Sequence, residues 1–520
     1  MRRNLKVQFF NDFTGGLNNN QQRQNLEPNE TPDCMDVVFN NRGGFRTRRG
    51  FSTLVSASGA LDGGYIGGSF SAGTEVLWGI THGGGLWTYD GTTFTNVATA
   101  NSVDSNVIVK SAVWDDKLYF ANWLSSSTLL MRYWDGSSLT TLTNTANNDY
   151  TAPTGGNAPL ARQIANHSGH MFWADTTESG TRYRSRLRFS HPLQPEDFAD
   201  NDYFDIEPAD QTDEITALVP FQNMMLVFKR KGVYGLYGYD RETFIVQRLS
   251  TQAGVSCRES VDTNSGIAYW WSLDGNVYAF NGSGIVPVGD RIKGIVNDGI
   301  TVTGCLTNRV RWIDNQLWVS LKKTGGDRIL FVYDPSVGQN GAWTKFSFAP
   351  TSMFWWKRSG AQSKIVFLKE SSNYLYDMSD PDKEGDTTGA TTAVIPAYYK
   401  MAWYSALDTG LGKRWSRPTV TAASTAVGVL VVEVYHDFNE AVIDRTLLMD
   451  VDGTETGRMY WGDDWGTDWN ANDSDVVYEF RRLSSLGRAN AVQLKFRMTN
   501  STNAWWIDSV AIPYLEKAYR

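Results

Sequence analysis

A repeated pair of strands with a short turn between them is the feature that most limits what this chain can fold into. From about residue 51 to 390, runs rich in Trp, Tyr, Phe and Val alternate with turns such as DDK, DGN and DN. Asp, Gly and Asn supply the positive φ or the side-chain cap that a tight hairpin turn requires. The segments with this pattern are Glu75–Val97, Ser111–Leu142, Ser168–Pro192, Phe221–Gly238, Ile267–Val288, Val310–Phe346 and Ser363–Met378.

A hairpin unit of this size has too little apolar surface to be stable alone. Stacking the units side by side around a common centre buries both of their faces. The pattern therefore predicts a β-propeller of about six or seven blades over residues 51–390. Unrelated hairpins within one large sandwich are the alternative. The 20 Trp, 23 Tyr, 25 Phe and 48 Gly favour an all-β fold of either kind.

The segments on either side of this repeat have a different character. Residues 1–50 are polar and include LNNNQQRQNLEPNETPD, which predicts an extended arm with an entry hairpin. The acidic, Gly- and Thr-rich stretch Asp377–Thr392 predicts a solvated hinge. Beyond it, alternating strands of six to ten residues predict a β-sandwich or jelly roll over residues 391–520. The expected chain is all-β, with an arm, a propeller and a sandwich in that order.

Charge and cysteine usage limit the partners and the compartment. The formal net charge is −8 and the pI about 5.3, so the chain does not hold DNA by neutralising phosphates, although double-stranded DNA can pass it. The three cysteines, Cys34, Cys257 and Cys305, are too sparse for a metal motif or a disulfide framework, which predicts assembly in a reducing compartment. The longest apolar run, Val427–Tyr435, is about half the length of a membrane span. We expect a chain made in the host cytoplasm, with no signal peptide and no membrane-spanning segment.

Four arginines stand close together in the otherwise acidic chain. The segment NNRGGFRTRRGF contains Arg42, Arg46, Arg48 and Arg49, and its Gly pair lies between two strand-like runs. This pattern predicts a strand, a tight turn and a second strand, with Arg46 and Arg48 on one face. A short basic hairpin in an acidic protein favours contact with an acidic neighbouring protein over nucleic acid. The four arginines are therefore a candidate docking hairpin.

Tryptophans and aspartates are interspersed in YWGDDWGTDWNANDSD, Tyr460–Asp475. Sugar rings stack on tryptophan and carboxylates do acid–base work, so this loop is a candidate glycan-contact or glycosidic site. The alternative is a long loop whose tryptophans pack on the edge of the sandwich. The candidate contact residues are Trp461, Asp464, Trp465 and Trp469.

Other polar clusters lack the spacing of a known site. The carboxylates of DMSDPDKEGD do not follow the EF-hand order, and His167 and His170 have no third zinc ligand nearby. No G-x-S-x-G elbow occurs in a strand–helix context. We therefore expect no catalytic residue, no metal and no cofactor, and hence a protein that is not an enzyme.

Three stretches resemble virion proteins of tailed bacteriophages. DFTGGLN (Asp12–Asn18), followed by PNETPDCMDVVFNNRGGFRTRRGF (Pro28–Phe51), resembles the entry of phage proteins that begin with a GGLN box and run to G-x-x-x-R-x-G before a propeller. Arg186–Gly238 resembles the propeller segment of the tail nozzle proteins of short-tailed phages, also called tail tubular protein B. Leu411–Val420, together with Trp505–Leu515, resembles a sandwich ending common in phage structural proteins.

This resemblance implies a structural nozzle or hub component of the virion tail. Nozzle proteins typically form a homo-oligomer of six copies around the DNA channel, dock on the head-to-tail adaptor or connector, and offer outer surfaces to tail fibres or spikes. Double-stranded DNA passes transiently, and a net acidic ring would repel it from the wall. A carbohydrate-binding tail protein that contacts host surface glycans is the alternative, and a propeller hydrolase is a third hypothesis.

Overall fold

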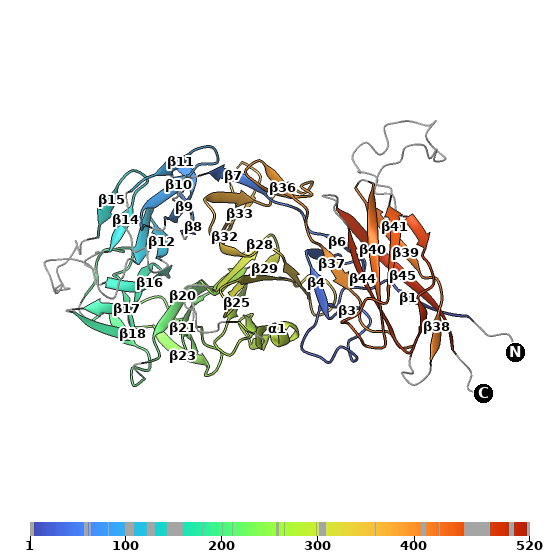
Figure 1. The fold of residues 1–520 in the computed structure, drawn as a ribbon. Helices are drawn as coiled ribbons and strands as arrows, with labels where there is room; N and C mark the ends of the chain where they lie inside the picture. Colours follow the sequence, from blue (N-terminus) through green and yellow to red (C-terminus); the bar gives the residue numbers. More distant parts are fainter. Residues whose placement is uncertain are drawn as a thin grey trace, which may run out of the picture.

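The computed structural model describes the chain except for residues 1–4, 57–60, 62–63, 82, 99–108, 122–130, 143–159, 179, 200, 211, 256–258, 265, 298, 301–307, 359, 407–411, 426, 452–478, 499–503 and 517–520. Nearly all of the regular structure in the described part is β-strand (Figure 1). The helical elements there are the 3-10 turn η1 (Asp290–Ile292) and the short helix α1 (Lys293–Asn297). The prediction of an all-β chain is confirmed.

Among the described residues, seven antiparallel sheets hold four strands each. Every hairpin unit expected from the sequence lies within one of them. The first three sheets are β8 (Tyr65–Ala72), β9 (Thr74–Ile80), β10 (Leu86–Tyr89) and β11 (Phe94–Asn96); β12 (Lys110–Trp114), β13 (Lys117–Ala121), β14 (Arg132–Trp134) and β15 (Leu139–Thr141); and β16 (Leu160–His167), β17 (His170–Glu178), β18 (Thr181–Phe189) and β19 (Tyr203–Asp205).

The remaining four sheets continue in chain order, and the last one takes a strand from the start of the chain. They are β20 (Ile215–Phe221), β21 (Met224–Lys229), β22 (Val233–Tyr237) and β23 (Ile245–Ser250); β24 (Val261–Asn264), β25 (Ile267–Trp271), β26 (Val277–Phe280) and β27 (Ile285–Pro287); β28 (Arg309–Ile313), β29 (Gln316–Lys322), β30 (Arg328–Asp334) and β31 (Ala342–Phe346); and β32 (Pro350–Trp356), β33 (Lys364–Lys369), β34 (Tyr374–Asp377) and β7 (Ser52–Ser56).

The hairpin turns have the backbone conformation that their sequence demands. Asp115 and Asp116, between β12 and β13, have φ of 46° and 55°. Asp314 and Asn315, between β28 and β29, have φ of 47° and 63°. Asp and Asn enter this left-handed region more readily than other side chains, and two successive positive φ angles match the right-handed twist of the strands.

The first strands of the seven sheets contact one another in succession. β8 contacts β12, and the series continues through β16, β20, β24 and β28 to β32, which contacts β8 again. In the seventh sheet β7 pairs with β34, placing Thr53 opposite Tyr376. Figure 1 shows the sheets following one another in colour order from β8 to β33. We call residues 52–377 the seven-sheet region.

Two further sheets form the other end of the molecule and share one apolar core. We call them the two-sheet region. The larger sheet holds β1 (Lys6–Phe10), β5 (Val37–Phe39), β6 (Phe45–Thr47), β38 (Lys413–Trp415), β39 (Thr419–Ser424), β42 (Glu479–Arg482), β43 (Gly487–Ala489) and β45 (Trp505–Glu516). The other holds β4 (Asp33–Met35), β37 (Tyr398–Lys400), β40 (Gly428–His436), β41 (Arg445–Val451) and β44 (Val492–Met498).

The N-terminal segment belongs to these sheets as much as the C-terminal strands do. β1 pairs with β45, and β4 pairs with β37. Between these strands, β2 (Gly16–Leu17) and β3 (Glu30–Thr31) form a short parallel pair. The sequence predicts an extended arm with an entry hairpin over residues 1–50. In the structure, four strands of this segment pair within the two-sheet region. The domain boundaries drawn from the sequence stay predictions.

The expected hinge is held in place near its centre, whereas residues 380–382 and 388–392 are exposed. It contains a small hairpin, β35 (Asp386–Thr388) and β36 (Thr391–Ala393). The backbone N–H of Thr387 donates to the carbonyl of Phe51 at 2.7 Å. Acidic composition alone does not show which carboxylate of such a stretch has a buried partner, and here Asp386 pairs with the buried Arg48.

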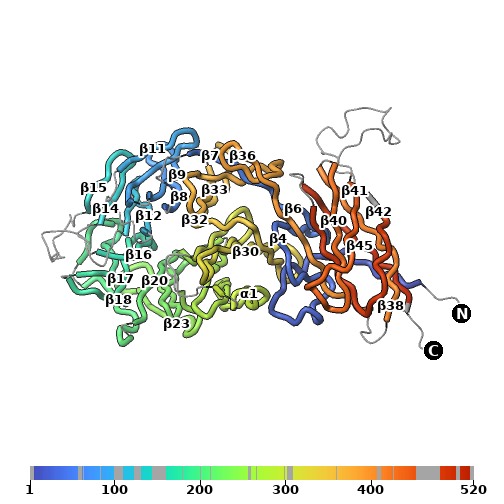
Figure 2. The backbone as a smooth tube through the Cα atoms, in the orientation of Figure 1, coloured from blue at the N-terminus to red at the C-terminus, as the bar shows by residue number. Residues whose placement is uncertain are grey.

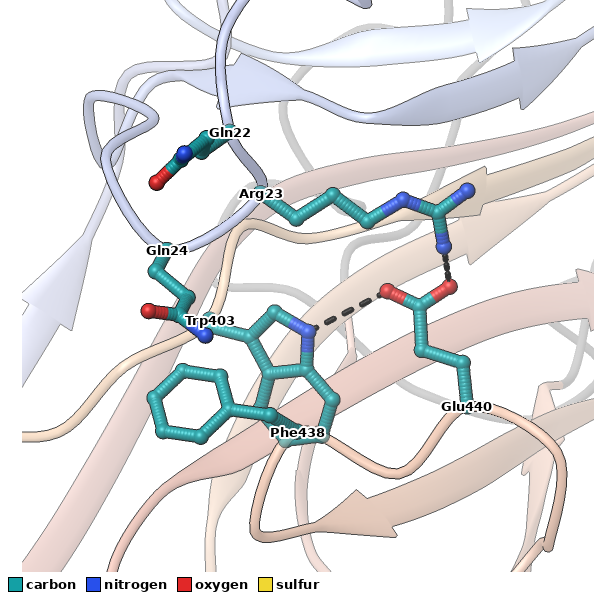
Figure 3. A pocket seen from close by; sticks show the side chains of 6 residues that line it. All are labelled: Gln22, Arg23, Gln24, Trp403, Phe438 and Glu440. Carbon is teal, nitrogen blue, oxygen red and sulfur yellow. Dashed lines mark hydrogen bonds and ion pairs between the residues drawn. The ribbon is translucent and has the colours of Figure 1, made fainter.

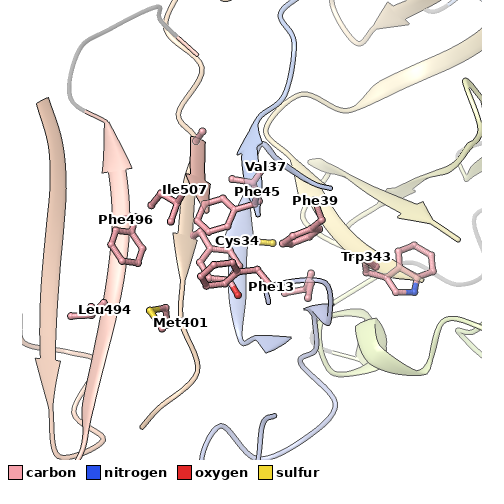
Figure 4. Packing of buried hydrophobic residues seen from close by; sticks show 14 of the residues in the cluster. Phe13, Cys34, Val37, Phe39, Phe45, Trp343, Met401, Leu494, Phe496 and Ile507 are labelled. Atoms are coloured by element: carbon pink, nitrogen blue, oxygen red, sulfur yellow. The ribbon is translucent and has the colours of Figure 1, made fainter. Parts of the chain in front are cut away.

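One continuous apolar core joins the two regions. It runs from β40 and β44 through the N-terminal segment to β29, β30 and β31. Figure 4 shows Phe13 and Phe45 between Phe496 on one side and Trp343 on the other. Phe45 stacks on Tyr399 with ring centroids 4.3 Å apart. In Figure 2 the N-terminal trace passes between the two regions, so residues 12–51 act as a wedge packed on both sides.

Candidate functional site

Arg48 lies at the centre of the contact between the wedge and the seven-sheet region. Its side chain is fully buried, and its Nε donates to Asp36 Oδ1 at 2.6 Å. Nη1 and Nη2 donate to the two carboxylate oxygens of Asp386 at 2.8 and 2.7 Å. The guanidinium carbon also lies 4.7 Å from the ring centre of Phe348. Burial lowers the pKa of Arg48, but the two carboxylates outweigh it and raise the pKa above its ordinary value.

Of the other three arginines, one pairs with a carboxylate of this chain and two have exposed side chains. Arg49 forms an ion pair with Asp314, in the turn between β28 and β29. Arg42 and Arg46 are exposed. Arg48 and Arg49 therefore bind carboxylates of this chain, and of the predicted docking hairpin Arg42 and Arg46 present their side chains to solvent.

The expected shared face of Arg46 and Arg48 is wrong. β6 ends at Thr47, so the alternation of a strand does not extend to Arg48. Asp36, just before the opposing strand β5, has φ of 56°, and its carbonyl accepts the backbone N–H of Arg48 at 2.9 Å. This irregularity turns the Arg48 side chain into the core while Arg46 points to solvent.

Residues that carry the phage-protein resemblance lie at this same junction. In GFRTRRG (Gly44–Gly50) the arginine of G-x-x-x-R-x-G is Arg48, and a Cβ on Gly50 would lie 2.2 Å from the carbonyl oxygen of Gly385. In the GGLN box, Gly16 has φ 65°, and a Cβ there would meet the backbone of Trp343 at 2.9 Å. Both glycines are needed because another backbone packs directly against them.

A second charged group lies among the first strands of the seven-sheet region. Glu259 accepts Lys110 Nζ at 2.5 Å and also pairs with Arg311. Nearby, Asp262 accepts the backbone N–H groups of Trp312 at 2.7 Å and Thr263 at 2.9 Å. Burial raises the pKa of Asp262 to about 6, and these N–H donors only partly oppose that shift.

The candidate glycan loop lies outside the described residues. Trp461, Asp464, Trp465 and Trp469 all fall in the range 452–478, and their role stays a prediction. The acidic stretch near residue 380 lies among the residues that the structure describes. Asp377 pairs with Lys364 at 3.0 Å, and Asp386 pairs with Arg48. The described residues hold no group of three or more His, Cys, Asp or Glu side chains arranged for a metal ion.

A pocket of about 470 Å³ opens in the two-sheet region, lined by residues that sequence reasoning missed (Figure 3). Trp403 follows β37, and Phe438 and Glu440 follow β40. The loop Gln22–Gln24 of the wedge forms the opposite wall. The Trp403 and Phe438 ring centroids are 5.0 Å apart. No local pattern could unite the side chains of Arg23 and Glu440, which lie 417 positions apart.

Glu440 is held by donors from three directions. Its Oε1 accepts the indole N–H of Trp403 at 3.1 Å. Its Oε2 accepts Lys400 Nζ at 2.6 Å and also pairs with Arg23. Burial of the ammonium, and the charge of Arg23, lower the pKa of Lys400 to about 8. The carboxylate is thus fixed by three donors, and the two charged residues that line the pocket, Arg23 and Glu440, carry opposite charges.

The turn that carries Phe438 is strained. Asp437 and Phe438 have φ of 50° and 62°, and the Asn439 N–H donates to the His436 carbonyl at 3.0 Å. A turn of this type favours Asn-Gly, and a side chain such as Phe costs about 1–2 kcal/mol in the left-handed region. The Asp437 carboxylate accepts the N–H of Asn490 at 2.6 Å, which holds the turn in place. The mismatch rests on φ angles, so the residues of this turn do not by themselves indicate the pocket.

No family model matches the chain, and no curated protein matches it. Among solved structures it is similar to BBS1N in complex with ARL6DN, at 10% identity and a TM-score of 0.39, over 65% of this chain and 99% of that one. It is also similar to YCF48 bound to D1 peptide, at 10% identity and 0.37, over 67% and 98%. The Swd1 β-propeller domain of Myceliophteria thermophila gives 9% and 0.40, over 64% and 99%. Likenesses this low carry no argument about function.

Within the described ranges, no helix has both the length and the apolar character needed to cross a bilayer.

Proposed function

We propose that this chain is a structural component of a bacteriophage virion tail, a nozzle or hub part that forms a ring around the DNA channel. In this role it docks on the head-to-tail adaptor, supports fibres or spikes, and takes part in genome retention and ejection without catalysis. The seven-sheet region is a closed seven-bladed β-propeller, and the two-sheet region is a β-sandwich of jelly-roll type.

The junction carries this proposal. The GGLN box and the G-x-x-x-R-x-G segment are the stretches that resemble phage tail proteins, and they supply Gly16, Arg48 and Gly50 to the contact between the two regions. A continuous core and a buried ion-pair group on the same segment resist relative movement of the regions. A part of this kind suits a ring that bears load.

Charge supports the same role. The formal net charge of −8 disfavours binding to DNA that passes through the ring. Arg42 and Arg46 are exposed on the wedge, where they offer a small basic surface for an acidic neighbour such as the adaptor. Salt pairs at the rim of an interface set orientation and association rate more than affinity.

Mass photometry of the purified full chain tests the ring. We expect a species of about six times 58.2 kDa that accumulates as concentration rises to the micromolar range. A chain that stays monomeric at every concentration and does not sediment with purified tails would contradict the proposal.

Sedimentation with tail preparations that lack this chain tests the docking surface. The double variant Arg42→Glu/Arg46→Glu should reduce the bound fraction at least tenfold at low salt, because it reverses two charges of the basic surface. Arg482→Glu/Arg488→Glu changes the net charge equally at exposed arginines elsewhere in the two-sheet region, and should sediment like the parent chain. Equal loss in both variants would remove the hairpin from the docking surface.

A further inference from the structure

The larger sheet of the two-sheet region packs one face on the shared core and turns the other face outward. Along β45, Val510, Ile512 and Tyr514 are buried in that core, and the partly exposed Ala511 and Leu515 alternate with them on the outward face. Residues that pair directly across neighbouring strands lie on the same face, so the register of β45 assigns its neighbours to one face or the other. Figure 1 shows β1, β38 and β45 at the end of the molecule away from the sheets of β8 to β19.

β1 gives this outward face a row of apolar side chains. Val7 pairs with Pro513, and Phe9 pairs with Ala511. Leu5 lies one alternation before Val7, and Leu5, Val7 and Phe9 are 52%, 43% and 66% exposed. Among the described residues β1 pairs with β45 alone, so the apolar row follows a free edge of the sheet. A row of exposed apolar side chains at a sheet edge marks an interaction surface.

Two arginines stand directly opposite one another on the same face. Arg414 of β38 pairs with Leu515 on one side and with Arg488 of β43 on the other, so both arginines point outward. Like charges in this position repel each other and destabilise the strand pair. Both side chains are exposed, and within the part of the chain that the structure describes neither guanidinium has an ion pair or a hydrogen bond. An anion bound beside them would offset the repulsion.

A third arginine shows how the charged and apolar parts of the face are arranged. Arg482 of β42 pairs with Thr419, Thr419 pairs with Ala511, and Ala511 pairs with Phe9. These four residues form one row across four strands, with the arginine and the phenylalanine about 14 Å apart at its ends. Arg482 is exposed and likewise lacks an ion pair or a hydrogen bond among the described residues. The outward face is therefore apolar along one edge and basic along the other.

These two edges require different chemistry from the same partner. The basic edge needs anions, and the apolar edge needs a surface that takes up exposed hydrocarbon. A bilayer of anionic lipid presents phosphates and acyl chains side by side at every point, so it meets both needs without a matched spacing. An acidic protein would have to carry its carboxylates and an apolar patch at this one separation.

We propose that the outward face of the larger sheet binds the surface of an anionic lipid bilayer. The apolar side chains of the β1 edge enter the boundary between headgroups and acyl chains, and the three arginines donate hydrogen bonds to lipid phosphates. The backbone of β1 stays at the level of the headgroups, because an open sheet edge does not enter hydrocarbon. This binding goes beyond the proposed ring, which gives no role to β1 or to these three arginines.

Co-sedimentation of the purified full chain with lipid vesicles tests the proposal. The probes are vesicles of phosphatidylcholine alone and vesicles with about one-third phosphatidylglycerol. At low salt we expect at least tenfold tighter binding to the anionic vesicles, with a preference that shrinks as salt is added. An anionic bilayer repels a chain of net charge −8 as a whole, so such a preference requires a local basic face. No binding to the anionic vesicles, or equal binding to both kinds, would overturn the proposal.

A double variant tests the basic edge. Arg414→Gln/Arg488→Gln should weaken binding to the anionic vesicles at least tenfold. It also removes the repulsion between β38 and β43, so the urea midpoint should not fall, and a loss of binding is then not a loss of folding. Lys231→Gln/Lys323→Gln is the matched control, because it removes two exposed charges from the seven-sheet region, and it should bind like the parent chain. Equal losses in the two double variants would refute the assignment of this face.

A single variant tests the apolar edge. Phe9→Ser should weaken binding to both kinds of vesicle at least fivefold. Ile245→Ser is the matched control, since Ile245 is also 66% exposed and begins the edge strand β23 of the seven-sheet region. It should leave binding unchanged, and full binding by the Phe9→Ser variant would contradict the proposal.

Poly-L-glutamate is the probe for an acidic protein partner. If it binds as tightly as the anionic vesicles, and if Phe9→Ser weakens neither interaction, the face accepts acidic polypeptide and the lipid proposal is overturned. These measurements need neither tails nor ring assembly. Their failure would leave the ring proposal standing, and a chain that stays monomeric could still bind the vesicles.

Discussion

Replacement of Arg48 by methionine should strongly destabilise the fold. The change leaves Asp36, whose side chain is fully buried, with one remaining hydrogen bond, from the backbone N–H of Ser347 at 2.8 Å. It also removes two charge-assisted bonds to Asp386. Removing one partner of a buried ion pair costs about 3–5 kcal/mol, so we expect a loss of this size in the free energy of unfolding. Methionine fills part of the vacated volume, which keeps the cavity contribution small.

Urea unfolding followed by far-UV circular dichroism measures this loss. Arg46→Met alters an exposed arginine two positions away and should change stability by less than about 0.5 kcal/mol. The double variant Arg48→Met/Asp36→Asn removes both buried charges, so its cost should be about 1–3 kcal/mol smaller than the sum of the single costs. A cost of Arg48→Met below about 1 kcal/mol would refute the view that this group joins the two regions.

Three further predictions concern single positions. Gly50→Ala should cost about 1–3 kcal/mol and speed hydrogen exchange of residues 383–387, because its Cβ would lie 2.2 Å from Gly385, whereas Gly325→Ala meets nothing within 4 Å. Lys229→Met should cost about 3–5 kcal/mol, because it removes the buried ion-pair partner of Asp213 and the donor to the carbonyls of Ile206 and Glu207, while the exposed Lys231→Met should not. The pKa of Asp262 rises from 3.8 to about 6 on folding, so its stabilising contribution is present below pH 4 and is lost as pH rises through 6. The stability of the parent chain relative to Asp262→Asn should therefore fall between pH 4 and 7, and a flat difference would contradict the shift.

Local patterns explain which parts of this fold the sequence could predict. The turns at Asp115–Asp116 and Asp314–Asn315 lie between strands only a few residues apart, so residue type alone determines them. The pairing of β7 with β34 and of β1 with β45 joins segments more than three hundred residues apart. No periodicity within either segment records such a partner, because an edge strand has the same alternation whichever strand it meets.

The residues around Arg48 show the same contrast between local patterns and long-range contacts. The sequence marked four arginines together, but it could not tell that Arg48 faces two carboxylates, because one of them lies 338 positions away. Its burial depends on Asp36 leaving the extended conformation, which the residue type permits without requiring it. The pocket joins Arg23 to Glu440 across 417 positions, and no local pattern records that contact.

Synthesis from the N-terminus makes strands β1 and β7 long before the strands with which they pair. β7 pairs with Tyr374–Asp377 and β1 with Val510–Tyr514, so these two strands have no partner until most of the polypeptide has emerged, whereas β2 pairs with β3 and β5 with β6 locally. Phe13, Phe39 and Phe45 are exposed throughout that interval, since their core is completed by residues near the C-terminal end. A product that ends before β45 therefore leaves these aromatic side chains incompletely buried, which favours aggregation. The larger sheet of the two-sheet region therefore forms only after β45 has been made.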